Sequence, residues 1–342
     1  AHFGRALRRR GQAHHRERGP GAAQPHRADP ALAPLAQRAG LGAPAEACTD
    51  FDEYVNGQWR KATPIPPDRA RIGSFDTLRD ESRDIVEQAL IDAARNPSQL
   101  DTPGKLLAFR FYISGMDVEA VEKRRLASLQ PLLRQIDALS DRRQLPVLLA
   151  QLSRHYIDAP LRVAVMPDAK DRRRYLVQLD QGGLGLPDRD DYFRDDKRTL
   201  ELRKAYESYR LRLGQLAQIG DAPAAAAASF ELQTSLADAS LTRVARRDPN
   251  ALYQLNTLET IMQRAPGLDW AAYFTAMGVA KPGEFNVAAP KFVAAVARAA
   301  AEAPLATWRA YLRERVLDEV APMLTAEFVA ARFDYRGKVV QG

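Results

Sequence analysis

The sequence predicts a mainly α-helical fold, a large lobe of many helices with one small β-hairpin. After residue 47, apolar residues recur at intervals of three and four, which is the period of amphipathic helices. Only residues 161–179 alternate apolar and polar side chains, as half-buried strands do. With 342 residues, 46% of them apolar and 27% charged, the chain has the size and composition of a globular protein.

The expected helices follow from this periodicity together with their start and stop signals. Pro103, for example, fits the first turn of a helix because the N–H that it lacks has no partner there. We expect the apolar side chains of that helix, including Leu107, to pack inward. The expected helices cover 50–60, 75–94, a stretch from 103, a stretch from 117, 129–139, 145–156, 199–220, 223–244, 253–262, 270–277, 290–301 and 307–328, the last of them despite Pro322.

The β-hairpin is expected from the alternation at 161–166 and 175–179, which the polar turn 167–173 joins. A glycine-rich run at 181–190 follows it. This run lacks both the G-x-G-x-x-G pattern and the Lys-Ser/Thr pair of a phosphate-binding loop. We therefore interpret it as a structural turn.

The first 46 residues form a basic tail rich in Ala, Arg, Pro and Gly, which we predict to be disordered. The tail holds eight arginines and three acidic residues, so five of the seven net positive charges lie there. In 47–342 the two signs of charge are interleaved, which argues against nucleic acid as a partner. The tail lacks the apolar core of a signal peptide, and no apolar run reaches the length of a transmembrane helix.

The sequence contains no pattern of residues typical of a catalytic or metal site. The zinc motif H-E-x-x-H is absent, and four of the five histidines lie in the tail. The fifth, His155, is interpreted as a structural or surface residue, although a Ser–His–Asp triad would also need it. Cys48 is the only cysteine, so it has no disulfide partner in the chain, and we expect it to be partly buried. We predict no catalytic residue and no metal ligand.

Two arginines, Arg71 and Arg79, remain as candidate substrate-binding residues. They flank an expected helix start, and the planar guanidinium fork suits a carboxylate such as the C-terminus of a peptide. The residues by themselves leave an ordinary alternative open, which is that both arginines form ion pairs with neighbouring carboxylates. Those neighbours are Asp76, Asp80 and Asp84.

Short segments spread over 47–342 form a pattern of their own. They are Asp50-Phe51, Tyr54-Val55-Asn56-Gly57 with Trp59, Pro64-Ile65-Pro66, Arg71-Ile72-Gly73-Ser74-Phe75, Leu78-Arg79-Asp80-Glu81, Tyr112 with Ser114 and Met116-Asp117, Gly183-Leu184-Gly185-Leu186-Pro187-Asp188-Arg189-Asp190 with Tyr192, Arg246-Arg247-Asp248-Pro249 with Tyr253, Trp308 with Tyr311-Leu312, and Phe333-Asp334-Tyr335-Arg336-Gly337-Lys338. In order and spacing these segments resemble the neprilysin and endothelin-converting-enzyme family of zinc endopeptidases.

This resemblance implies two mostly helical lobes around a central chamber, with residues 47–342 matching the lobe that caps it. The thermolysin-like catalytic lobe, with its H-E-x-x-H motif, downstream Glu ligand and Asn-Ala motif, is expected to be missing here. Arg71 and Arg79 match two family arginines that bind the C-terminal side of the substrate. The resemblance also implies peptide substrates, zinc in the complete enzyme but not in this chain, and a location that is often periplasmic, secreted or membrane-anchored.

Two functional hypotheses follow from these observations. In the first, the chain is the N-terminal substrate-chamber domain of a neprilysin-like zinc metalloendopeptidase, truncated before the zinc site and inactive alone, because it lacks the metal that activates water. Apolar surface that faces the missing lobe would then be exposed. In the second hypothesis, the chain is a non-catalytic helical module that binds peptides or a partner protein.

Overall fold

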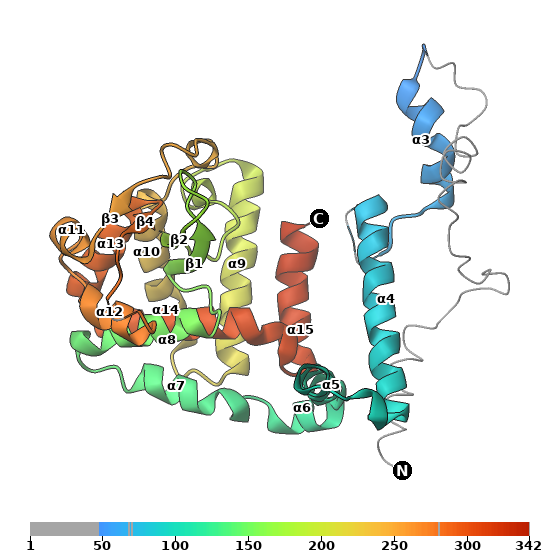
Figure 1. The fold of residues 1–342 in the computed structure, drawn as a ribbon, viewed down its shortest axis with the longest axis horizontal. Helices are drawn as coiled ribbons and strands as arrows, with labels where there is room; N and C mark the ends of the chain where they lie inside the picture. Colours follow the sequence, from blue (N-terminus) through green and yellow to red (C-terminus); the bar gives the residue numbers. More distant parts are fainter. Residues whose placement is uncertain (1–47, 68, 70, 280, 342) are drawn as a thin grey trace. The chain divides into compact units, whose positions relative to one another are not determined.

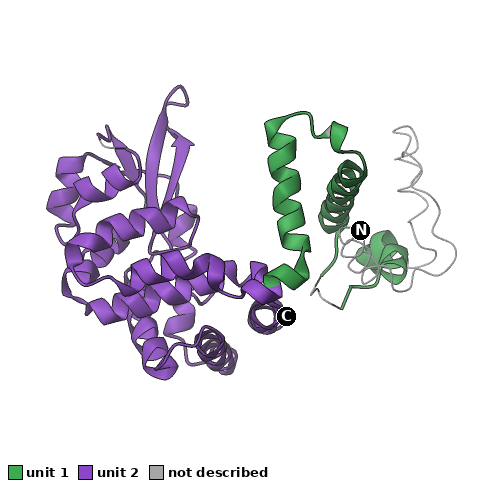
Figure 2. Ribbon diagram, turned by 90° about the horizontal axis from the view of Figure 1, so that it is seen from below, with its two compact units in different colours: residues 1–121, 341–342 green, residues 122–340 purple. Residues whose placement is uncertain are grey.

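The computed structural model describes residues 48–67, 69, 71–279 and 281–341. Helices dominate the described chain, and a small four-stranded sheet is set among them (Figure 1). The chain divides into two compact units (Figure 2), unit 1 with residues up to 121 and 341–342, and unit 2 with residues 122–340. The prediction of a mainly α fold with a β-hairpin is confirmed. The tail predicted at 1–46 lies outside the described residues.

The described part of unit 1 is helical, and capping side chains begin two of its helices. Asp50 accepts the N–H of Glu53 at 2.8 Å, and Thr102 caps the helix that Pro103 opens. The elements are α3 (Phe51–Ala62), α4 (Ser74–Arg95), the 3₁₀ turn η2 (Pro97–Gln99), α5 (Pro103–Met116) and α6 (Val118–Arg124), the last of which crosses into unit 2.

Apolar side chains of α4 and α5 are largely exposed. Phe75 of α4 is 86% exposed, and Phe111 of α5 is 72% exposed. The expectation that Leu107 packs inward is wrong, because this side chain is 70% exposed and α5 buries none of its residues. Other apolar residues of α5 expected to pack inward are half-buried, namely Leu106, Phe109, Tyr112 and Ile113. Cys48, which we expected to be partly buried, is exposed as well.

Unit 2 contains all the strands and most of the described helices. Its elements are η3 (Ala127–Leu129), α7 (Gln130–Asp137), η4 (Arg142–Gln144), α8 (Leu145–Arg154), β1 (Leu161–Pro167), β2 (Tyr175–Gln181), η5 (Arg189–Tyr192), α9 (Lys197–Leu216), α10 (Ala222–Ala239), η6 (Ala245–Arg247), β3 (Leu255–Asn256), α11 (Leu258–Arg264), α12 (Trp270–Ala276), β4 (Phe285–Val287), α13 (Pro290–Glu302), α14 (Leu305–Val320), η7 (Ala321–Met323), α15 (Ala326–Arg332) and the π-helix η8 (Phe333–Val340). None of the described helices is both long enough and apolar enough to cross a membrane.

The sheet has the strand order β1-β2-β4-β3. β1 and β2 form the predicted antiparallel hairpin, with Leu161 opposite Gln181, whereas β4 runs parallel to β2 and antiparallel to β3. β3 and β4 were not predicted, because two or three residues are too few to reveal an alternation. The helix expected over 253–262 is wrong at its start, since β3 occupies that stretch and Thr257 caps α11 afterwards.

The single long helix expected over 307–328 is also wrong. α14 ends at Val320, Pro322 lies in η7, and α15 begins after Leu324 has turned to an extended conformation. Proline supplies no N–H to the helical ladder, and its ring clashes with the preceding turn. The regularly spaced apolar residues before and after Pro322 therefore belong to two separate helices, α14 and α15.

The core of unit 2 is built around buried aromatic side chains. Trp270 and Trp308 are fully buried, and each indole N–H donates to a backbone carbonyl, that of Ala265 (2.8 Å) and that of Ala299 (3.1 Å) respectively. A second cluster gathers Tyr206, Tyr209, Phe328 and Tyr335, among others, from α9, α15 and η8. This second cluster encloses the polar network described below.

Leu149 of α8 is fully buried in this core, so Leu149→Ala should lower the free energy of unfolding by about 3 kcal/mol through lost burial and a residual cavity. Leu200→Ala is the matched control, because Leu200 of α9 is 48% exposed and its loss should change stability by less than about 0.5 kcal/mol. Urea unfolding followed by circular dichroism measures both changes. Equal effects would contradict the assignment of Leu149 to the core.

Candidate functional site

The two arginines predicted to bind substrate both lie in unit 1 and are both exposed. Arg71 belongs to the segment that precedes α4, and Arg79 lies in the second turn of that helix. Gly73 begins α4 in an extended conformation, and its carbonyl accepts the N–H of Asp76 at 2.9 Å and that of Thr77 at 3.0 Å. The helix start between the two arginines is therefore as the sequence predicted.

Arg71 and Arg79 differ in their partners. Arg79 donates to the carboxylate of Asp76, one turn earlier on α4, which is an ion pair named by the alternative interpretation. Asp80 is held by Arg69 through two hydrogen bonds of 2.6 and 2.9 Å, and these lower the pKa of Asp80. Arg71 makes no hydrogen bond or ion pair with any residue that the structure describes.

The glycine-rich loop that follows β2 packs tightly against tyrosines of unit 2. Gly183 has φ of +73°, and a Cβ at this position would collide with the Tyr311 hydroxyl. A Cβ on Gly185 would collide with the ring of Tyr206. Both glycines are thus required for close approach of the backbone, which agrees with the interpretation of this run as a structural turn.

A buried hydrogen-bond network holds this loop. Gln233 of α10 accepts the backbone N–H of Gly185 and the hydroxyl of Tyr192, each at 2.9 Å, and donates to Glu314 of α14, also at 2.9 Å. Tyr206 of α9 donates to the same Glu314 carboxylate at 2.6 Å. Burial raises the pKa of Tyr206, and the nearby Glu314 carboxylate raises it further, so this hydroxyl remains a donor.

A buried carboxylate, Asp318 of α14, forms the second part of the network. It accepts the hydroxyl of Tyr209 at 2.7 Å, Nη2 of Arg315 at 3.0 Å and Nη2 of Arg336 at 2.8 Å. Burial alone would raise the pKa of Asp318, but the guanidiniums of Arg315 and Arg336 outweigh burial and lower the pKa to about 2. This cluster was not predicted from the sequence, because Tyr209 lies 109 residues before Asp318 and Arg336 lies 18 residues after it.

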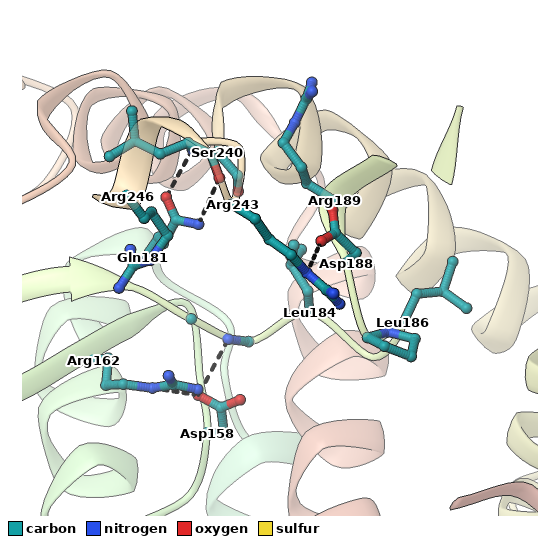
Figure 3. A pocket seen from close by; sticks show the side chains of 14 residues that line it. Asp158, Arg162, Gln181, Leu184, Leu186, Asp188, Arg189, Ser240, Arg243 and Arg246 are labelled. Atoms are coloured by element: carbon teal, nitrogen blue, oxygen red, sulfur yellow. Dashed lines mark hydrogen bonds and ion pairs between the residues drawn. The ribbon is translucent and has the colours of Figure 1, made fainter. Parts of the chain in front are cut away.

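A cleft of about 280 Å³ lies beside the glycine-rich loop, between the ends of β2 and α10 (Figure 3). Figure 3 connects Arg243 with Asp188 and Arg162 with Asp158. Every arginine that lines the cleft is paired with a carboxylate: Arg162 with Asp158 (2.9 Å), Arg189 with Asp190 (2.7 Å), Arg243 with Asp188, and Arg246 with Asp180 (2.7 Å). The cleft is therefore polar but charge-balanced.

The chain resembles known proteins over most of its length. A family model, Peptidase family M13, matches residues 47–342. This chain belongs to peptidase family M13. Endothelin-converting enzyme 1 of Cavia porcellus is 26% identical over 254 residues, covering 72% of this chain and 33% of the relative. The endothelin-converting enzyme homolog of Locusta migratoria is 27% identical over 249 residues, covering 69% and 33%.

Solved structures of M13 peptidases share the fold. The Mycobacterium tuberculosis zinc metalloprotease Zmp1, in complex with an inhibitor, matches with a TM-score of 0.81 and 31% identity over 87% of this chain and 46% of Zmp1. PepO from Lactobacillus rhamnosis matches with a TM-score of 0.71 at 18% identity, which speaks for the fold alone. The chain thus spans about a third of the length of its curated M13 relatives and under half of these structures.

The zinc ion that the M13 family implies needs three or four converging His, Cys, Asp or Glu side chains. Among the residues that the structure describes, no three such side chains form a group that could hold a metal ion. His155 is exposed at the C-terminal end of α8, in agreement with the interpretation as a surface residue. The described residues of this M13 chain therefore do not fit zinc, and none of them is assigned a step in metal chemistry.

The Asp318 cluster generates a prediction about acid stability. In the folded protein the pKa of the Asp318 carboxyl group is about 2, below its ordinary value of 3.8. The ionised carboxylate therefore stabilises the fold above pH 4. About 2 kcal/mol of this stabilisation should be lost as the pH falls to 2. Asp318→Asn should cost about 3 kcal/mol at pH 7, because buried guanidiniums lose their counter-charge. This deficit should shrink by about 2 kcal/mol at pH 2.

Urea unfolding of the wild-type and Asp318→Asn proteins at pH 7 and pH 2 measures this change. Asp238→Asn is the matched control, because the Asp238 carboxylate is 81% exposed and should contribute little at either pH. A deficit of Asp318→Asn that is the same at both pH values would show that Asp318 is not ionised against the arginines.

Proposed function

We propose that this chain forms the chamber-capping, peptide-binding part of an M13 zinc metalloendopeptidase, and that peptide hydrolysis requires zinc ligands that residues 47–342 do not supply. The observation that carries the proposal is the M13 family match over 47–342, in a sequence without H-E-x-x-H. A zinc peptidase needs the metal to activate water and polarise the scissile carbonyl. The part that this chain plays in such a reaction is to bind and orient the peptide.

The binding role that we propose is supported by the state of Arg71. It is exposed, it is unpaired among the described residues, and it precedes the helix that carries Arg79. A guanidinium with no internal counter-charge can form two parallel hydrogen bonds with the C-terminal carboxylate of a peptide. Arg79 shares its charge with Asp76, so we assign it the weaker contact.

A partner lobe is supported by the exposed apolar side chains of unit 1. Large apolar residues on α3, α4 and α5 are more than 50% exposed, which is unusual for helices that carry a regular apolar face. A catalytic lobe of the kind found in M13 relatives would give this face a partner. The exposed residues are Phe51, Phe75, Leu78, Ile85, Val86, Leu107 and Phe111.

The purified chain should contain no stoichiometric zinc and should not cleave a short fluorogenic peptide in a chelator-sensitive way. Metal analysis, together with the cleavage rate with and without chelator, measures both properties. One zinc per chain with chelator-sensitive cleavage would overturn the proposal, because a ligand set would then exist within this sequence. Peptide binding without zinc and without cleavage is expected both for a chamber-capping lobe and for a non-catalytic binding module. Adding a catalytic lobe distinguishes the two, because only the chamber-capping lobe should then support hydrolysis.

The role of Arg71 predicts a preference for a free C-terminal carboxylate. A labelled peptide ending in a carboxylate should bind about 10-fold more tightly than its C-terminally amidated twin, since a charged hydrogen bond contributes about 1.5 kcal/mol or more. Arg71→Ala should remove this preference. Arg110→Ala, which removes an exposed arginine of α5, is the matched control and should keep it. Fluorescence anisotropy measures the affinities of the three proteins for the two peptides, and equal binding of both peptides to the wild-type chain would count against the site.

A further inference from the structure

The strand β1 forms one edge of the sheet, because only β2 pairs with it (Figure 1). Just before the strand, the N–H of Gly182 donates to the carbonyl of Pro160 at 3.1 Å, so Pro160 and every second residue after it face β2. In an antiparallel ladder the intervening residues direct their backbone groups away from the partner strand. These outward-facing residues are Leu161, Val163, Val165 and Pro167.

Most of these outward-facing backbone groups have no partner. The carbonyl of Leu161 accepts the hydroxyl of Ser153 on α8 at 3.2 Å. Beyond it, no hydrogen bond joins the outward groups of Val163 or Val165 to any residue that the structure describes. Val165 is also 67% exposed, whereas Val163 is half-buried against the core. An unpaired edge of this kind is a template for an added strand.

A cavity of about 360 Å³ adjoins the same end of β1. Its lining includes Leu161 and Val163 of the strand and Ser153 at the end of α8. Tyr156 also lines it, with an 89% exposed side chain and a φ of +57°. A non-glycine residue in this left-handed region is uncommon, and such residues concentrate at binding sites. The open edge and the cavity thus form one continuous surface.

The cavity also holds a carboxylate without a counter-charge. Two acidic residues line it, and one of them, Asp158, is paired with Arg162 at 2.9 Å. The other, Glu319 of α14, is half-buried and forms no ion pair or hydrogen bond with any described residue. A partly buried carboxylate favours a ligand that brings a positive charge.

We propose that the open edge of β1 binds an extended peptide segment as an added strand, with a lysine or arginine side chain of that segment paired with Glu319. The outward N–H and C=O groups of Val163 and Val165 supply backbone hydrogen bonds, and the cavity takes alternate side chains. This site requires neither Arg71 nor hydrolysis. It is therefore a second peptide-binding surface, selective for basic segments.

The test uses two fluorescein-labelled hexapeptides with amidated C-termini, so that Arg71 has no carboxylate to bind. The first is Thr-Val-Thr-Lys-Thr-Val, which places Val, Lys and Val on one face of a strand, and the second has Glu in place of Lys. The wild-type chain should bind the Lys peptide about 10-fold more tightly than the Glu peptide. Glu319→Gln should remove the preference and Glu319→Lys should reverse it.

Glu259→Lys, which introduces the same charge change at an exposed site on α11, is the matched control and should keep the preference of the wild type. If Glu319→Lys does not fold, Glu319→Gln still decides the charge pairing. No binding of the Lys peptide, or a preference unchanged in Glu319→Gln, would overturn the proposal. If the chain dimerises as its concentration rises and peptide binding is lost at the same time, the edge of β1 pairs with a second copy of the chain. That result would also overturn the proposal.

Strand addition has a signature that side-chain binding alone lacks. In an added strand, only every second backbone N–H of the peptide donates to β1. Methylating the nitrogens that donate to β1 should weaken binding by more than 10-fold, because those hydrogen bonds are lost. Methylating the other alternate set should change the affinity by less than about twofold. Anisotropy with the two methylated Lys peptides measures this. Equal affinity of the two would contradict pairing with the strand edge.

Discussion

The burial of one carboxylate, Asp318, is the constraint on which unit 2 depends. An ionised group inside a protein is stable only if opposite charges and hydrogen bonds replace the water that it loses. Asp318 obtains these from Tyr209 of α9, from Arg315 of its own helix and from Arg336 of η8. Helix α9, whose Tyr209 is 109 residues from Asp318 in the sequence, must therefore assemble with α14 and η8 around this one side chain.

The neighbouring network extends this constraint to the glycine-rich loop. Tyr311 donates to the carbonyl of Gly183 at 2.9 Å, and Tyr335 donates to that of Gly185 at 3.3 Å, so α14 and η8 hold the loop on both sides of Leu184. Buried side chains therefore satisfy backbone polar groups of the loop. The glycine-rich loop of this M13 chain is therefore a structural turn, and we assign peptide binding to other parts of the chain.

The groups to which we assign peptide binding are those that the fold leaves unpaired. Arg71 is a guanidinium without a counter-charge among the described residues, Glu319 is a carboxylate without one, and β1 is a strand with one open edge. The charges of the cleft beside the glycine-rich loop, in contrast, are already balanced by one another. Ligands gain most from polar groups that the protein does not satisfy itself, because no internal bond must first be broken.

The sequence by itself determined the helical class, the β1–β2 hairpin, the start of α4 and, through short motifs, the M13 family. These features depend on local periodicity, capping residues and fixed spacings, which a chain carries before it folds. Only the tertiary structure decided that Pro322 separates two helices, that Leu107 is exposed, and which arginines are paired. It alone brought Glu319 beside the open edge of β1, since such proximity depends on the packing of α14 against distant segments and leaves no trace in the spacing of residues.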